Sequence, residues 1–94
     1  DDVLTWLRQL EGHLRSAVNR ANAFLDERSW FGAGVTANQA AFCQFQLHEI
    51  LVTDGLLLTQ SDFAEWSEYD DHYEHEIERI RRQAREGSME MENE

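Results

Sequence analysis

The fold is decided by the stretch from residue 3 to residue 25, VLTWLRQLEGHLRSAVNRANAFL, in which apolar side chains recur every three or four residues. This spacing matches the turn of an α-helix and gathers the apolar side chains on about a third of its surface. Seven positions make up this stripe: Val3, Leu7, Leu10, Leu14, Ala17, Ala21 and Phe24. We therefore expect one amphipathic helix from residue 2 to about residue 28, and its stripe needs a packing partner along the whole length.

A break in this periodicity follows at residues 29–34, SWFGAG, where two glycines predict a turn. Thr36 and Gln39 have the spacing of a capping box, which predicts a second helix from residue 37 to about residue 53. Its side chains are apolar nearly all round, which is typical of a central helix or of one shared with a partner. The dipeptide Asp54-Gly55 predicts its end.

The third predicted helix runs from residue 60 to residue 86. Thr59 and Asp62 form a second capping box, and Gly87-Ser88 predicts the helix end. The three leucines at 56–58, just before this helix, are expected to plug one end of the fold. The inward stripe of the helix comprises Phe63, Trp66, Tyr73, Ile77, Ile80 and Ala84, with Asp70 as an exception inside it.

The 94 residues include no proline and only five glycines, so an all-β chain with many turns is disfavoured. We predict an all-α fold, a three-helix bundle in which two long helices surround a shorter apolar one. A single helical domain would cover residues 1–87, and residues 88–94 would form a frayed acidic tail. The long apolar stripes exceed what the shorter helix can cover, which further predicts a homodimer.

The charge of the chain restricts its function. Nineteen acidic residues against eight arginines give a net charge of −11, which argues against direct binding to nucleic acid or to an anionic membrane surface. The single Cys43 favours a reduced, cytoplasmic setting. No glycine-rich phosphate loop occurs, and no base lies beside Cys43 in the sequence, so we expect neither catalysis nor a cofactor.

Nine acidic residues and no lysine or arginine lie from Asp54 to Glu78, before four arginines at residues 79–85. The helix dipole explains acids in the first turn and arginines in the last, but not acids in the middle. Two interpretations remain: a solvated face, or a surface that binds a protein partner with a basic surface. The predicted contact residues are Glu65, Glu68, Asp71, Glu74, Glu76 and Glu78. In composition the chain resembles small acidic phage inhibitors of nucleic-acid enzymes, including some anti-CRISPR proteins, which implies inhibition by DNA mimicry.

A metal site is an alternative use of the same helix. His72, His75 and Glu76 share a helical face that could offer imidazole and carboxylate ligands to zinc or iron, and His48 with Glu49 could complete the set. The spacing matches no established metal motif, and solvated polar side chains are the simpler explanation.

Residues 37–80 resemble the helical region of nitrile hydratase β subunits and their accessory (activator) proteins. The resemblance is carried by Ala41-Phe42, Leu47-His48-Glu49, Gly55-Leu56, Phe63-Ala64-Glu65-Trp66 and Tyr73-Glu74-His75. It implies help in loading iron or cobalt into a catalytic subunit. In addition, Trp30-Phe31-Gly32 resembles the Trp-x-Gly turn of small secreted helical-hairpin proteins, although Asp54-Gly55 interrupts the long second helix of that family.

Overall fold

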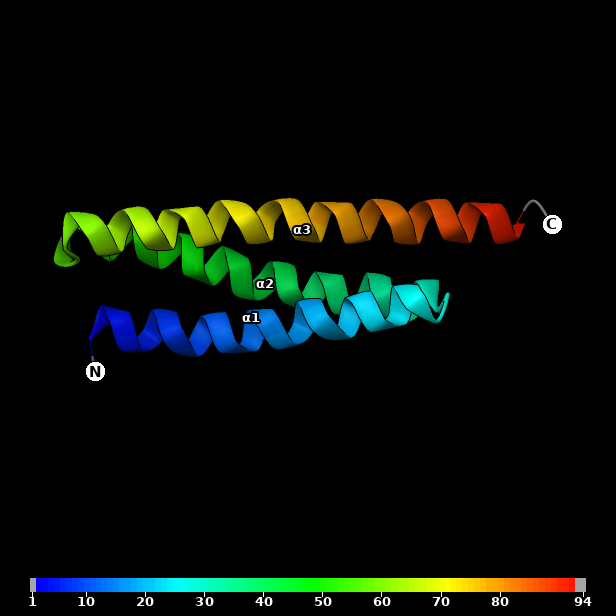
Figure 1. Cartoon of the computed structure of the whole chain (residues 1–94), viewed down its shortest axis with the longest axis horizontal. Helices are drawn as coiled ribbons and strands as arrows, with labels where there is room; N and C mark the ends of the chain where they lie inside the picture. Colours follow the sequence, from blue (N-terminus) through cyan, green and yellow to red (C-terminus); the bar gives the residue numbers. More distant parts are fainter. Residues whose placement is uncertain (1, 93–94) are drawn as a thin grey trace.

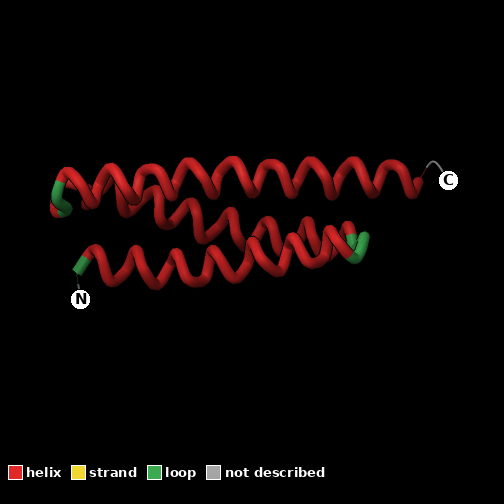
Figure 2. Tube along the Cα trace, viewed as in Figure 1, coloured by secondary structure: helices red, strands yellow, loops and turns green. Residues whose placement is uncertain are grey.

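Three helices account for almost all of the chain. The structure is a computed structural model that describes residues 2–92, in which α1 spans Val3–Asp26, α2 spans Trp30–Asp54 and α3 spans Gln60–Glu92. A short 3-10 turn, η1, spans Gly55–Leu57 and leads from α2 into α3. The predicted all-α class is confirmed. The helices run side by side in a rod of 53 × 18 × 17 Å, and the chain reverses at each end (Figure 1). Apart from the start of α1, loops lie only where the chain reverses (Figure 2).

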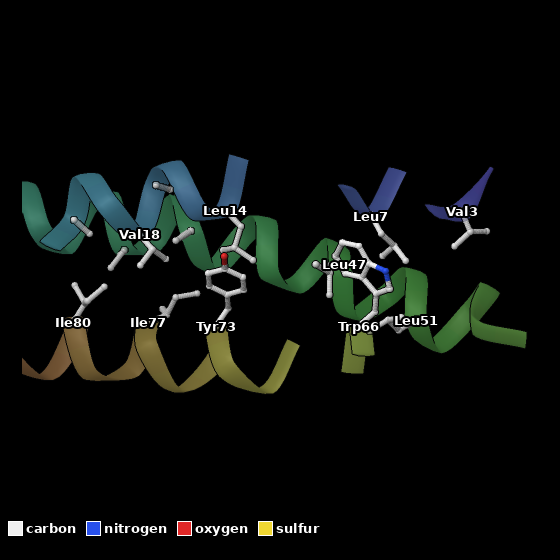
Figure 3. Close-up of a cluster of buried hydrophobic side chains, with 14 residues drawn as sticks. Val3, Leu7, Leu14, Val18, Leu47, Leu51, Trp66, Tyr73, Ile77 and Ile80 are labelled. Atoms are coloured by element: carbon white, nitrogen blue, oxygen red, sulfur yellow. The ribbon is translucent and has the colours of Figure 1, made fainter. Parts of the chain in front are cut away.

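The core lies where the three helices meet. α2 packs along both α1 and α3, whereas α1 and α3 touch each other much less. Leu7 and Leu14 of α1, Leu47 of α2 and Ile80 of α3 are the largest side chains that are fully buried. Figure 3 shows how Trp66, Tyr73, Ile77 and Ile80 reach from α3 toward the other two helices. The predicted inward stripe of α3 is therefore confirmed from Trp66 to Ala84, but Phe63 is exposed.

The turn between α1 and α2 is short and closely hydrogen-bonded. The Ser29 N–H donates to the Phe24 carbonyl at 2.8 Å, and the Arg28 N–H donates to the Leu25 carbonyl at 3.0 Å. This pair of bonds is a Schellman motif, which satisfies the last carbonyls of α1. Arg28 takes the left-handed position that glycine usually fills, with φ of 59°.

The helix α2 begins at Trp30, so the predicted start at residue 37 is wrong. Thr36 lies inside the helix and its hydroxyl donates to the Gly32 carbonyl at 2.7 Å, so it caps nothing. Gly32 lies within the helix, and its missing side chain leaves room for the Phe24 ring: a Cβ would lie 2.9 Å from Phe24 Cδ1. With 25 residues against 24 in α1, α2 is not the shorter helix that the sequence predicted.

The connection from α2 to α3 differs from its prediction in one respect. Thr59 caps α3 as expected, since its hydroxyl accepts a hydrogen bond from the Asp62 N–H at 3.0 Å. The leucines do not plug the end of the fold, because Leu56 and Leu57 point into solvent and only Leu58 packs against the core.

The helix α3 continues past Gly87 to Glu92, so its predicted end at Gly87-Ser88 is wrong. Its last turns extend beyond the turn between α1 and α2 (Figure 1). The domain limit at residue 87 stays a prediction, and residues 1, 93 and 94 lie outside the described part of the chain.

Candidate partner-binding surface

Four of the six predicted contact residues form a row that winds about halfway around α3, from one flank across its solvent side to the other. Glu65, Glu68, Asp71 and Glu74 are all exposed and follow one another at three-residue intervals. Residues three apart on a helix are neighbours on its surface, about 5–6 Å apart at Cβ. None of the four forms an ion pair with an arginine within residues 2–92. We refer to Glu65, Glu68, Asp71 and Glu74 as the acidic ridge.

The other two predicted contact residues have partners within the chain. Arg79 binds Glu76 at 3.0 Å and also donates to Asn22 of α1 at 2.8 Å. This hydrogen bond from Arg79 holds the pKa of Glu76 below its usual value. In the same way Glu78 binds Arg81 at 3.2 Å.

These two arginines connect α3 to its neighbours, because Arg81 donates to Asn38 of α2 at 2.9 Å. Half-exposed ion pairs of this kind contribute about 0.2–1 kcal/mol each. The structure thus separates the predicted set into four free carboxylates and two that belong to interhelical contacts.

The predicted metal ligands are not gathered into a site. The His75 Nδ1 atom lies 2.7 Å from the Asp71 backbone carbonyl, and Glu76 is held by Arg79. His72 lies with its ring edge against Tyr73. Across the described chain, no group of three or more histidine, cysteine, aspartate or glutamate side chains is arranged to hold a metal ion. The metal-delivery function that was inferred from residues 37–80 stays a prediction.

Asp70 is the most deeply buried carboxylate of α3 and joins it to α2. Gln44 Nε2 donates to Asp70 Oδ1 at 2.6 Å, and His48 Nδ1 lies 2.8 Å from Asp70 Oδ2. The hydrogen bond to Asp70 raises the pKa of His48 above its usual value, and the nearby charges of Glu49 and Glu74 act in the same direction. The sequence showed Asp70 as an exception in an apolar stripe. It also showed Gln44 and His48 one turn apart, but not that these residues meet.

A second buried hydrogen bond connects α3 to α1. The Tyr73 hydroxyl donates to Glu11 Oε2 at 2.7 Å. Burial and the adjacent carboxylate both raise the pKa of Tyr73 far above its usual value, so the phenol stays protonated and continues to donate. These polar contacts fix the rotation of α3 about its own axis, and this rotation decides which carboxylates face solvent.

The solvent-facing side of α2 is the feature that sequence reasoning missed. Its apolar side chains are largely exposed: Phe31 86%, Val35 42%, Phe42 65%, Phe45 57% and Val52 67%. We call these five residues, with the fully exposed Leu56 of η1, the outer face of α2. The sequence indicated a helix that is apolar nearly all round. The sequence pattern that could have revealed this face is the alternation of three- and four-residue steps along its exposed positions.

These features define an all-α protein with free carboxylates on one helix and exposed apolar side chains on another. No helix within residues 2–92 is long and apolar enough to cross a bilayer. No family model matches the sequence, and neither a curated protein nor a solved structure matches the chain.

Proposed function

We propose that this chain is a non-catalytic interaction protein whose acidic ridge binds the basic surface of a protein partner. The observation that carries the proposal is the run of four exposed carboxylates, Glu65, Glu68, Asp71 and Glu74, without an arginine partner in the described chain. Each unpaired carboxylate repels its neighbours and weakens the helix slightly. A bound cationic surface would offset that repulsion.

The spacing of the ridge favours a partner that ordinarily binds nucleic acid. Carboxylates three residues apart advance by about 4.5 Å along the helix axis. Phosphates advance by about 3.4 Å along each strand of duplex DNA. A cationic groove that encloses the solvent side of α3 would therefore meet charges at a comparable axial spacing, in a row that turns by about 60° at each step. Occupation of such a groove would inhibit the partner in the manner of a DNA mimic or an anti-CRISPR protein.

Two further properties belong to this proposal. The three packed helices act as a rigid three-helix bundle that presents the ridge without reordering, which lowers the entropic cost of binding. The protein would act in the cytoplasm, where the single Cys43 stays reduced.

The test is a comparison of two charge-matched variants. In the ridge variant, Glu65→Gln, Glu68→Gln, Asp71→Asn and Glu74→Gln remove four charges from α3. In the control, Asp26→Asn, Glu27→Gln, Glu86→Gln and Glu90→Gln remove four exposed charges elsewhere. Each immobilised chain is exposed to a lysate of the source cell, and the retained proteins are identified and eluted with rising salt.

We expect the wild type and the control to retain the same basic nucleic-acid-binding protein, which the ridge variant loses. Duplex DNA should compete for that protein, and retention should fall as salt increases, because both depend on the same charges. Equal retention by the ridge variant would contradict the proposal.

A further inference from the structure

The outer face of α2 follows a regular heptad spacing. Starting at Phe31, one set of exposed positions advances by steps of four and three residues along α2 and ends in η1. They are Phe31, Val35, Asn38, Phe42, Phe45, Glu49, Val52 and Leu56. A 3.5-residue period is the pattern by which two helices pair along a common seam. The core of the protein does not use this seam, because the buried residues of α2, among them Ala37, Ala40 and Leu47, lie on the opposite side of the helix.

The exposed apolar area on this seam is large enough for a stable interface. A large side chain exposes about 150–200 Å² when fully accessible, so the six apolar residues present on the order of 700 Å². A standard protein interface buries about 800 Å² per partner, and the largest apolar patch of an ordinary monomer covers about 300–600 Å². A partner that covers this face would therefore bury most of the area of a standard interface against a single helix.

The charge distribution around the seam favours a second copy of the same chain. The chain carries a net charge of −11, so most approaches between two copies are repulsive. The positions that flank the seam are uncharged or small: Gly32, Gln39, Gln46 and Thr53 on one side, and Gly34, Ala41, His48 and Gly55 on the other. Glu49 is the one acid within the seam, so a strongly basic partner has little to bind here.

We propose that two copies pair antiparallel through the outer faces of their α2 helices, about a two-fold axis at the level of residues 43 and 44. The seam is symmetric about this level. In the antiparallel register Phe42 lies opposite Phe45 of the second copy, and Val35 lies opposite Val52. At the two ends Phe31 lies opposite Leu56.

The polar positions of the seam also agree with this register. Asn38 lies opposite Glu49 of the second copy, so each carboxylate meets an amide. The Asn38 Oδ1 atom already accepts hydrogen bonds from Arg81 at 2.9 and 3.2 Å, which leaves the two N–H groups of Nδ2 to donate to that carboxylate. Arg81 brings a positive charge to the same place. A parallel pair would instead put Glu49 opposite Glu49, where two like charges repel.

The first test is the mass of the chain in solution. We expect light scattering at about 100 µM, well above a micromolar Kd, to give twice the chain mass of 11.0 kDa. The double variant Phe42→Glu, Phe45→Glu should halve this mass and keep its helical circular dichroism, since both side chains are exposed. The control Met89→Glu, Met91→Glu changes two exposed apolar residues of α3 equally and should stay dimeric. A monomeric wild type, or a dimeric Phe42→Glu, Phe45→Glu variant, would overturn the proposal.

The second test determines the orientation. In a Cys43→Ser background, Val35→Cys and Val52→Cys chains are oxidised separately and as a mixture. The antiparallel register joins the two different chains and separates identical positions by about 25 Å along the axis. We expect cross-linked dimers only in the mixture, whereas cross-linking of Val35→Cys alone would show a parallel pair. This dimer does not depend on the acidic ridge, so either proposal can fail alone.

Discussion

Asp70 is a carboxylate in the middle of the apolar stripe of α3, and its two hydrogen-bond partners explain why the stripe tolerates it. Gln44 and His48 both come from α2 and engage one carboxylate oxygen each. A buried acceptor that loses its donors costs about 1–3 kcal/mol, so any slip of α3 along α2 is penalised. Apolar residues on either side, such as Trp66 and Ile77, would tolerate such a slip more readily. Asp70 therefore specifies how α3 aligns with α2.

The contact between His48 and Asp70 predicts a dependence of stability on pH. Because folding raises the pKa of His48, the pair contributes its full stability below the unfolded value of about 6.5 and loses it as the pH rises through the folded value. We expect the wild type to exceed a His48→Gln variant in free energy of unfolding by more at about pH 6 than at about pH 8.5. The His48 side chain is half exposed, so screening keeps the difference below about 1 kcal/mol.

Urea denaturation of both chains at the two pH values measures this difference, and the other histidines cancel in the comparison. If this difference in free energy of unfolding were larger at high pH, Asp70 would not stabilise the protonated form of His48.

The helices α1 and α3 were visible in the sequence because each has a polar and an apolar side. The helix α2 was harder to place, because one of its apolar faces packs in the core and the other faces solvent, so no amphipathic period marks its limits. Two glycines, one in α2 and one in α3, were misread as helix breaks for a related reason. Gly32 accommodates the ring of Phe24, and Gly87 accommodates the ring of Trp30, and neither contact can be inferred from local sequence.

Two glycine substitutions distinguish a glycine that makes room for a neighbouring ring from one that has open space around it. A Cβ at residue 87 would lie 2.4 Å from the Trp30 ring, whereas a Cβ at Gly12 of α1 would meet nothing within 4 Å. We expect Gly87→Ala to lower the free energy of unfolding by about 1–3 kcal/mol through overpacking. Gly12→Ala should raise it by about 0.5–1 kcal/mol, because glycine is a poor helix former.

Urea denaturation measures both changes, and tryptophan fluorescence should shift only in Gly87→Ala. An equally stable Gly87→Ala chain would mean that the end of α3 does not pack on Trp30.

The whole molecule is a narrow rod with a large negative charge. The net charge is −11 on a body 17–18 Å thick. Because the screening length is about 8 Å at physiological salt, most acidic side chains are close enough to another one to repel it. The acidic ridge contributes four carboxylates without an arginine partner in the described chain. Self-repulsion therefore opposes the compact state most strongly at low ionic strength.

Salt should accordingly stabilise the protein. We expect the melting temperature to rise between about 10 mM and about 200 mM NaCl, by roughly 4–8 °C for each kcal/mol of repulsion removed. The ridge variant with four neutral side chains should have a higher melting temperature at low salt, and its melting temperature should change less as salt is added. Thermal melts followed by circular dichroism, at one fixed protein concentration, measure both effects. A wild type whose melting temperature falls with salt would show that favourable ion pairs, such as those of Arg79 and Arg81, outweigh the repulsion.

The packing of α2 against both of its sequence neighbours has a consequence for how the chain forms. Most interhelical contacts form between helices that are consecutive in the sequence and joined by short turns. The entropic cost of loop closure is therefore small, and folding should be fast for a chain of this length. During synthesis α1 and α2 can pair while α3 is still being made. Gln44 and His48 then stay in water until α3 arrives with Asp70. The helix that is made after α1 and α2 is thus the one whose alignment depends on a buried carboxylate.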